Sequence, residues 1–383
     1  MENHRRISGI ILILCAMLTL LLALFLLLSA KNESGPVSGG KQIPLKCSSL
    51  LSISDYDGYS VVSVRNPWGG GELARYILVP RAEELPDRLP EGTLLRTPLS
   101  RVVLFSGTHA ALLEELDAVD AIAGVCDSRY IYAETVAGRI SEGLVADCGS
   151  SMDIDAERLL EVSPDAVLVL PFENGGYGKL DRLNIPLVEC AEYMENSPLA
   201  SAEWIRFYGR LFGKAEFADS VFNEVSSEYE KLRNLAAASA VRPKLLCELK
   251  SSSAWYVPGG ESTMGRMYAD AGADYLFSYC KGGGSVPLSF ETVLERAADA
   301  DIWLMKYNSP VEKSYSSLLD EYSGYALLRP FAERNIFTCN TAGKRLFEES
   351  AFHPERLLKE LVAIFHPELM PGYKMRYYER MRQ

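Results

Sequence analysis

Two stretches of the chain repeat one another and place a glutamate at the same point. "DAERLLEVSPDAVLVL", which starts at Asp155, and "SFETVLERAADADIWL", which starts at Ser289, align without a gap, so that Glu157 falls on Glu291. Asp155 and Ser289 are good N-cap residues, which puts each glutamate in a first helical turn. A carboxylate there complements the helix dipole, and duplicated ancestry alone would also preserve the pair. At equivalent points of two lobes, the carboxylates could instead dock on basic side chains of a two-fold partner.

A second set of chemistry-bearing residues lies in segments that follow expected strands. Ligands of open parallel sheets bind beyond the carboxyl ends of the strands, so these segments predict the walls of a ligand cleft. Rings such as those of Trp255 and Tyr256 would stack on a flat conjugated ligand, with packing in the core as the alternative. The expected ligand-binding residues are Thr108, His109, Asn174, Tyr177, Trp255, Tyr256, Lys306, Tyr307 and Arg345.

The charged members of this set allow a metal chelate as the ligand. Lys306 and Arg345 could meet carboxylates or phosphate on it, although solvated surface positions are the usual place of such side chains. His109 could ligate a metal that a chelator already holds, or act as a structural residue at a helix start. The chain has only four histidines, whereas a free zinc or manganese ion needs several histidines and carboxylates together. We therefore expect no resident metal site and no cofactor.

Motifs of catalysis and nucleotide binding are missing from the sequence. The stretch "FSGTH" lacks the G-x-S-x-G pattern, no histidine and aspartate accompany a candidate serine, and neither G-x-G-x-x-G nor the P-loop pattern occurs. These absences favour a binding protein that is not an enzyme. The alternatives are a secreted or anchored chelatase or hydrolase that acts on a bound chelate, and a ligand-sensing or lectin-like module that works without a permease.

Composition bounds the partners and the size of the core. The 383 residues are 48% hydrophobic and 23% charged, with a formal net charge of -12, which suits two globular domains. An acidic surface repels phosphate backbones, so nucleic acid is excluded as a partner. The eight cysteines form no CxxC pair, which argues against a zinc ribbon or redox motif. Cys190 and Cys247 lie in apolar runs and are expected to be buried.

Strand-like and helical segments alternate over 101–190, and a second such series begins at "RPKLLCEL". This alternation predicts parallel sheets covered by helices. Between the two series, apolar residues from Trp204 to Leu232 are mostly three or four positions apart, in a helical stripe that is interrupted near Gly213. This pattern favours one long helix, with two ordinary helices at a domain edge as the alternative. Before the first series, "YSVVSVRNPWGGGELARYILVP" predicts short strands around a glycine turn.

The predicted fold class is therefore α/β, with two Rossmann-like lobes that have parallel sheets, a single long rigid helix that joins them, and an N-terminal β appendage. The expected divisions are a signal peptide or membrane anchor (1–30), a flexible tether and the β appendage (31–97), an N-terminal α/β lobe (98–197), an interlobe helix (198–240) and a C-terminal α/β lobe (241–383).

The first 30 residues predict where the chain is located. Arg5 and Arg6 precede a run without charges from Ile10 to Ala30, which is long enough at about 1.5 Å per residue to cross a hydrocarbon core of about 30 Å. Basic residues before such a run keep that end in the cytoplasm, so the rest is expected in the periplasm or another extracytoplasmic space. If the run is not cleaved, it anchors the chain to the inner membrane.

The order and spacing of several motifs from Arg101 to the C-terminus resemble one known family. These motifs are "RVVLFSGTHAALLEEL", "AIAGV", "SMDIDAERLLEVSPDAVLV", "WYVPGGEST", "DAGA" and "SVPLSFETVL". They are similar to the substrate-binding proteins of ABC importers for metal chelates, of the ferric-siderophore and cobalamin type. The segment before Arg101 departs from the simplest members of that family.

The resemblance implies two lobes joined by a long rigid helix, a cleft for cobalamin, a ferric siderophore or haem, and only modest hinge motion. It also implies delivery to an ABC permease dimer with its ATPase subunits. In that family one glutamate per lobe docks on arginines of the two permease subunits, and the matching positions here are Glu157 and Glu291.

Overall fold

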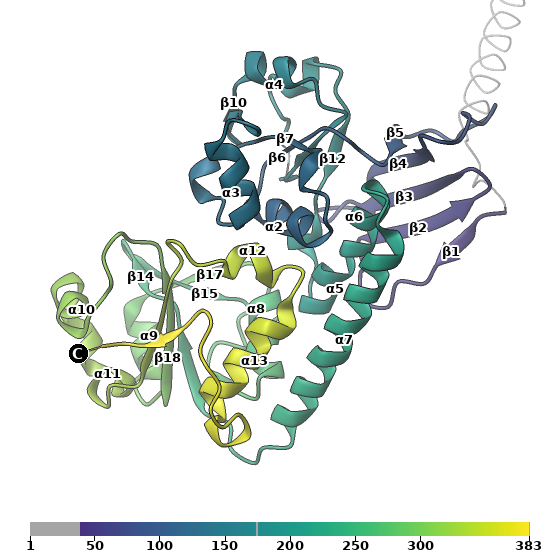
Figure 1. Ribbon diagram of the computed structural model, residues 1–383. Helices are drawn as coiled ribbons and strands as arrows, with labels where there is room; N and C mark the ends of the chain where they lie inside the picture. The colour runs from purple at the N-terminus through teal and green to yellow at the C-terminus, as the bar shows by residue number, and fades with distance from the viewer. Residues whose placement is uncertain (1–38, 174, 383) are drawn as a thin grey trace, which may run out of the picture.

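The structure is a computed structural model that describes residues 39–173 and 175–382. Figure 1 shows two α/β lobes, a helical segment along one side of the molecule, and a separate β-sheet beside that segment. The predicted α/β architecture is confirmed.

The N-terminal lobe is built on a parallel sheet with the strand order β12-β11-β6-β7-β8. Its central strands are short, wholly apolar and buried on both faces, as expected for parallel strands between helices. The strands are β6 (Val102–Leu104), β7 (Ile122–Val125), β8 (Ala146–Asp147), β11 (Ala166–Val169) and β12 (Leu187–Glu189), with a hairpin of β9 (Gly149–Ser150) and β10 (Asp153–Ile154), and the helices are α2 (Gly107–Glu115), α3 (Glu134–Ser141) and α4 (Ala156–Val162).

The C-terminal lobe repeats this plan, with the order β16-β13-β18-β19-β20 and an antiparallel edge strand. The strands are β13 (Lys244–Cys247), β16 (Asp274–Tyr275), β18 (Ile302–Tyr307), β19 (Ile336–Asn340) and β20 (Glu379–Arg380). The helices are α8 (Thr263–Asp270), α9 (Phe290–Ala297), α10 (Tyr315–Glu321), α11 (Arg329–Ala332), α12 (Leu346–Ser350) and α13 (Pro354–Phe365).

This lobe also carries a small antiparallel sheet, which includes the segment around Trp255 and Tyr256 that was predicted to form a wall of the ligand cleft. The sheet has the order β14-β15-β17, with β14 (Lys250–Ser251), β15 (Ala254–Pro258) and β17 (Ser285–Leu288). Side chains alternate along β15, so Trp255 and Val257 are buried whereas Tyr256 points outward. Short 3-10 turns complete the fold at η1 (Val119–Ala121), η2 (Ser128–Tyr130), η3 (Leu180–Arg182), η4 (Glu192–Met194), η5 (Ser323–Leu327) and η6 (Pro367–Leu369).

A single long helix between the lobes is confirmed, but it is shorter than the predicted range of 198–240. α5 (Pro198–Glu203), α6 (Ile205–Leu211) and α7 (Ala215–Ala237) share that range. The break before α7 falls at Gly213, whose φ of 69° is left-handed and ends α6. α7 therefore reaches about 35 Å rather than the roughly 60 Å of an unbroken helix, and packs against α6 and α13.

The N-terminal appendage is a five-stranded sheet in sequence order, as its alternating pattern predicts. The strands are β1 (Lys41–Ile43), β2 (Leu51–Tyr56), β3 (Tyr59–Arg65), β4 (Glu72–Pro80) and β5 (Thr93–Thr97). Residues 41–43 pair with β2, so they belong to the appendage sheet and not to the flexible tether that was predicted to precede it. Hydrogen bonding to β2 orders these residues into a strand, although Gly40 and Pro44 flank them.

Two buried carboxylates of the helical segment fasten the appendage. The side chain of Glu203 accepts hydrogen bonds from the backbone N–H groups of Lys46, Cys47 and Ser48 at 2.7 to 2.9 Å. Glu195 accepts from the N–H groups of Ser49 and Leu50 and from the indole of Trp204. The sheet is thus a fixed part of the molecule.

The predicted signal peptide or anchor at 1–30 lies outside the described residues. Among the helices of residues 39–173 and 175–382, none combines the length and the apolar character that crossing a bilayer requires. Within the same residues all cysteines are free, and Cys190 and Cys247 are buried as predicted.

Candidate functional site

A cavity of about 480 Å³ lies where the carboxyl ends of the N-terminal strands face the C-terminal lobe. The loops after β6 and β11 form its walls on one side, and the start of α12 closes it on the other. We call it the interlobe cavity. The position is the one that open parallel sheets use for ligands.

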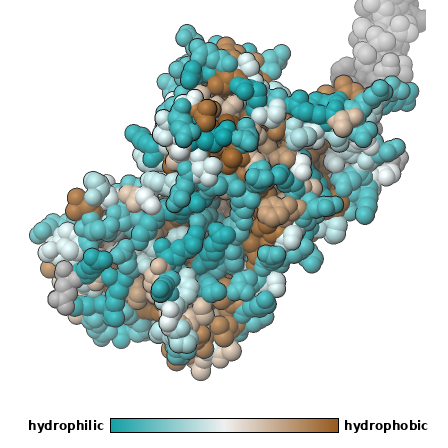
Figure 2. Space-filling model, in the orientation of Figure 1, coloured by the Kyte–Doolittle hydropathy of each residue, from teal (hydrophilic) through white to brown (hydrophobic). Residues whose placement is uncertain are grey.

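Aromatic rings dominate the lining of this interlobe cavity. Phe172 and Tyr193 are about half exposed and Phe347 is 59% exposed, although exposure of such rings costs free energy. Figure 2 shows apolar residues on the surface of the N-terminal lobe among polar ones. An aromatic patch in a concave site favours a ligand with a broad flat face. The rings that line the cavity are Phe105, Phe172, Tyr177, Tyr193 and Phe347.

A second, more polar cavity of about 340 Å³ adjoins the first. The two cavities share Ser106, Thr108 and Phe347 in their linings. The C-terminal lobe contributes Asn308 and Thr341 to the second. Together they offer an aromatic surface and a neighbouring set of hydrogen-bonding groups, as a chelate with an apolar face and polar substituents requires.

Two of the sequence-predicted ligand residues line these cavities. Thr108 lines both, and its hydroxyl donates to the carbonyl oxygen of Phe347 at 3.1 Å across the lobe boundary. Tyr177 lines the interlobe cavity and donates a hydrogen bond to Glu189. Burial, together with the Glu189 carboxylate, raises the pKa of Tyr177. Asn174 lies outside the described residues.

The predicted stacking role of Trp255 is corrected by its burial. Its ring is fully buried against Trp303, and its indole N–H donates to the carbonyl oxygen of Cys247 at 2.8 Å. Strand alternation turns Tyr256 to the exposed side, where it lines neither cavity. The core alternative therefore holds for Trp255.

Lys306 and Tyr307 are engaged within the C-terminal lobe and line neither cavity. Lys306 pairs with Glu248; burial alone lowers the pKa of this lysine, but the carboxylate raises it well above its ordinary value. The Tyr307 hydroxyl donates to Glu312 at 2.6 Å and accepts from the N–H of Lys313 at 3.0 Å. The prediction that both side chains are free to contact a ligand is corrected, because Lys306 already pairs with Glu248 and Tyr307 with Glu312.

His109 is also buried and lines neither cavity. Its Nε2 lies 2.9 Å from Oε1 of Glu192 and 3.2 Å from the Tyr208 hydroxyl. Burial alone lowers the pKa of His109, but the neighbouring Cys190 and Glu192 raise it above its ordinary value. Ser106 is the N-cap of α2, which places His109 inside the helix and toward the core. Its prediction as a contact to a chelated metal is therefore corrected.

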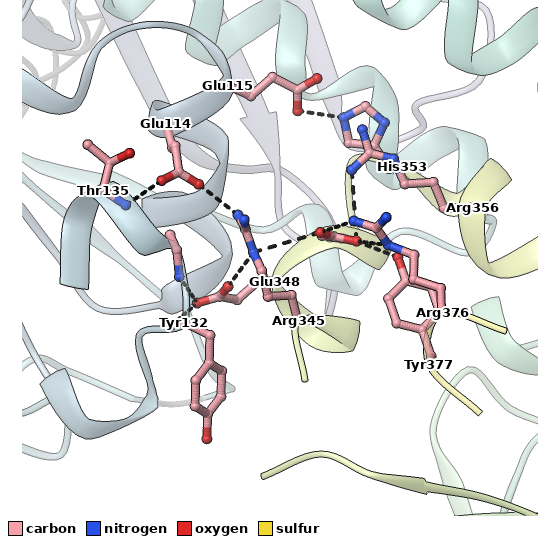
Figure 3. A network of polar contacts seen from close by, with 12 residues as sticks. Glu114, Glu115, Tyr132, Thr135, Arg345, Glu348, His353, Arg356, Arg376 and Tyr377 are labelled. Atoms are coloured by element: carbon pink, nitrogen blue, oxygen red, sulfur yellow. Dashed lines mark hydrogen bonds and ion pairs between the residues drawn. The ribbon is translucent and has the colours of Figure 1, made fainter. Parts of the chain in front are cut away.

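Arg345, which was predicted to contact the ligand, forms ion pairs that join the two lobes and lines neither cavity (Figure 3). Its guanidinium contacts Glu114 of α2 at 2.9 Å and Glu348 of its own lobe at 3.1 Å. Glu348 in turn accepts from the backbone N–H of Tyr132, in the N-terminal lobe, at 2.6 Å. We call this set, with the His353 pair described next, the interlobe network. It sets the separation of the lobes beside the cavities.

His353 completes the interlobe network, although the sequence analysis did not select it as a site residue. It lies 2.5 Å from Glu115 of α2 and 2.9 Å from Glu355. Burial alone lowers the pKa of His353, but hydrogen bonds to the two carboxylates raise it to about 8. Only the tertiary fold brings α2 beside the start of α13, so no spacing in the sequence indicates this pair.

The interlobe network is expected to weaken in mild alkali. The pKa of this histidine rises on folding from about 6.5 to about 8. The protonated side chain therefore contributes its full stabilisation below the unfolded-state pKa, and that stabilisation is lost as the pH rises through the folded-state pKa. Between about pH 6 and about pH 9, unfolding free energy should fall by about 1–2 kcal/mol more in the wild type than in His353→Gln. Urea unfolding at each pH measures this. Identical pH profiles for the two proteins would refute the ion pair.

The two repeated glutamates occupy the predicted positions on different lobes. The Asp155 carboxylate caps α4 by accepting from the N–H groups of Glu157 and Arg158, and the Ser289 hydroxyl caps α9 by accepting from that of Thr292. Both glutamates are exposed. Within residues 39–173 and 175–382, neither carboxylate takes part in an ion pair.

A family model described as "Periplasmic binding protein" matches residues 102–340. The matched range runs from the start of β6 to the end of β19. An uncharacterized lipoprotein of Methanocaldococcus jannaschii is 26% identical over 297 residues, which cover 74% of this chain and 69% of that protein.

Solved structures share the fold at low identity. A periplasmic haem-binding protein of Pseudomonas aeruginosa matches with a TM-score of 0.57 at 16% identity, over 74% of this chain and 99% of that one. The periplasmic vitamin B12 binding protein BtuF of Vibrio cholerae matches with a TM-score of 0.52 at 12% identity, over 72% and 99%. The TroA-like protein FepB of Veillonella parvula matches with a TM-score of 0.56 at 17% identity, over 76% and 98%.

Proposed function

This chain belongs to the periplasmic binding protein family, and from that premise we propose that it captures a metal chelate in the interlobe cavity and delivers it to an ABC permease. The observation that carries the proposal is the group of exposed rings between the lobes, at the ends of the parallel strands. The structurally similar proteins include binders of haem and vitamin B12. Cobalamin, haem and a ferric siderophore are the cargo classes that we propose.

Cargo capture follows from the character of the two cavities. The aromatic rings would cover the flat face of the chelate, and the hydroxyl and amide groups of the polar cavity would meet its substituents. Because the interlobe network already joins α2 to α12, capture needs little movement of one lobe against the other.

A larger cavity of about 810 Å³ lies between the appendage and the start of α7. It is a weaker candidate for the cargo site, because most of its lining precedes the family-matched range. Charged side chains such as Arg210, Lys214 and Glu216 also line it. The two cavities each contain an exposed phenylalanine, Phe217 in the larger and Phe347 in the interlobe cavity, which allows a matched test.

The permease partner is part of the same proposal. Glu157 and Glu291 project from the first turns of α4 and α9, one helix in each lobe. Two unpaired carboxylates on two lobes would suit basic residues on two permease subunits. An extracytoplasmic location is supported by the family and by the lipoprotein relative, and anchoring through residues 1–30 belongs to the proposal.

A binding panel tests the proposed function. The full-length chain in nanodiscs is titrated with haem, cobalamin and a ferric hydroxamate, with empty nanodiscs as the control for partition into lipid. One cargo class is expected to bind at a single site with submicromolar affinity and to quench tryptophan fluorescence. Flat titrations for every compound would remove the proposal.

A further inference from the structure

Three side chains that ligate metals converge inside the N-terminal lobe. His109 comes from α2, Cys190 follows β12, and Glu192 begins η4. One ligand atom from each lies within 4.8 Å of the other two. His109 and Cys190 are fully buried and Glu192 is nearly so. The fold thus brings three types of donor atom together, although His109 lies at least 81 positions before the other two residues in the sequence.

The donor set matches the preferences of a borderline divalent ion. Zinc binds imidazole nitrogen, thiolate sulfur and carboxylate oxygen, commonly with four ligands in a tetrahedron. The Tyr208 hydroxyl lies 2.8 Å from Oε2 of Glu192 and 3.2 Å from Nε2 of His109, so a further oxygen borders the cluster. A soft sulfur beside imidazole excludes magnesium and calcium as natural occupants.

The imidazole of His109 places Nε2 beside the other donors, 2.9 Å from Oε1 of Glu192. Nδ1 of His109 is buried and has no hydrogen-bond partner among the described residues. A buried polar atom without a partner costs about 1–3 kcal/mol. The hydrogen bonds to Glu192 and Tyr208 therefore do not satisfy the whole imidazole.

One of the three donor residues borders the interlobe cavity, and the three come from two separate segments of the lobe. Glu192 lines the interlobe cavity, whereas His109 and Cys190 do not; we call the part of the lining that Glu192 forms the cavity floor. An ion bound here would tie α2 to the segment that follows β12. It would hold the floor rigid beneath the cargo.

We propose that His109, Cys190 and Glu192 bind a zinc-like divalent ion beneath the floor of the interlobe cavity. The ion is a resident of the protein and not its cargo, so the site goes beyond the proposed transport role and stands without it.

Cobalt(II) is the spectroscopic probe for this site. The full-length chain in nanodiscs is stripped with a chelator and titrated with Co²⁺. One Co²⁺ per chain is expected, with thiolate-to-cobalt charge-transfer absorption in the near ultraviolet that Zn²⁺ abolishes by displacement. Absence of a stoichiometric charge-transfer band in the wild type would overturn the proposal, and this readout needs no variant.

Matched serine variants then locate the thiolate. Cys190→Ser should remove the band and weaken Co²⁺ binding by at least about tenfold, whereas Cys148→Ser, at an equally buried cysteine of the same lobe, should leave both unchanged. Near-ultraviolet circular dichroism establishes that each variant is folded. A band that persists in folded Cys190→Ser, or disappears in folded Cys148→Ser, would contradict the assignment. Cargo titrations do not enter this test, so its failure is distinct from failure of the proposed function.

Discussion

The double substitution Glu157→Lys and Glu291→Lys is expected to abolish cargo uptake by cells while leaving cargo affinity unchanged. Both carboxylates are exposed, begin helices in different lobes, and lie outside the linings of the two interlobe cavities. Reversal replaces two attractions with two repulsions at a basic docking surface, which costs several kcal/mol. Uptake of labelled cargo and equilibrium titration of the purified variant measure the two quantities.

The repeat itself provides the matched control for this test. Glu161 and Glu295 are also exposed and lie one turn further along the same two helices. Glu161→Lys with Glu295→Lys makes the same change in net charge, so uptake should persist if the first helical turns are the docking points. Uptake that survives reversal at Glu157 and Glu291 would contradict docking, and loss with both pairs would indicate a general charge effect.

Glu203→Ala is expected to lower the free energy of unfolding by about 3–5 kcal/mol. The substitution leaves the backbone N–H groups of Lys46, Cys47 and Ser48 without their acceptor. It also removes the carboxylate that lies 4.0 Å from the nearly buried Arg206. The expected loss is large because the carboxylate is fully buried between the appendage and the helical segment.

Denaturant unfolding measures this loss, with Glu224→Ala on the exposed side of α7 as the control. The control should change stability by less than about 0.5 kcal/mol. Equal small effects in both variants would mean that the appendage is not held by Glu203.

Local patterns predicted the architecture well because each fold element has its own signature. Alternation of apolar runs with helical periodicity indicated the parallel sheets, and the repeat indicated corresponding helices in two lobes. Asp155 and Ser289 cap those helices as their types predict. The length of the interlobe helix was overestimated, because the apolar stripe resumes after the interruption near Gly213, where the backbone turns and ends α6.

The candidate site was harder to predict, because side-chain partners come from distant segments. Thr108, Trp255 and His109 were all selected because they follow expected strands. The structure places Thr108 in the cavity lining, whereas Trp255 and His109 are buried in the core. Phe347 and Tyr193 were missed, since nothing local marks them as facing a cavity. The scarcity of histidine argued against a resident metal, whereas the fold brings a cysteine and a glutamate to His109.

The most direct test of cargo capture between the lobes repeats the titration of the best-bound cargo with two phenylalanine variants. Phe347 is 59% exposed in the interlobe cavity, and Phe217 is 48% exposed in the larger cavity beside the appendage. Phe347→Ala should weaken binding by about tenfold or more, with Phe217→Ala unchanged. Unchanged affinity in Phe347→Ala together with a loss in Phe217→Ala would place the cargo outside the interlobe cavity and contradict the account.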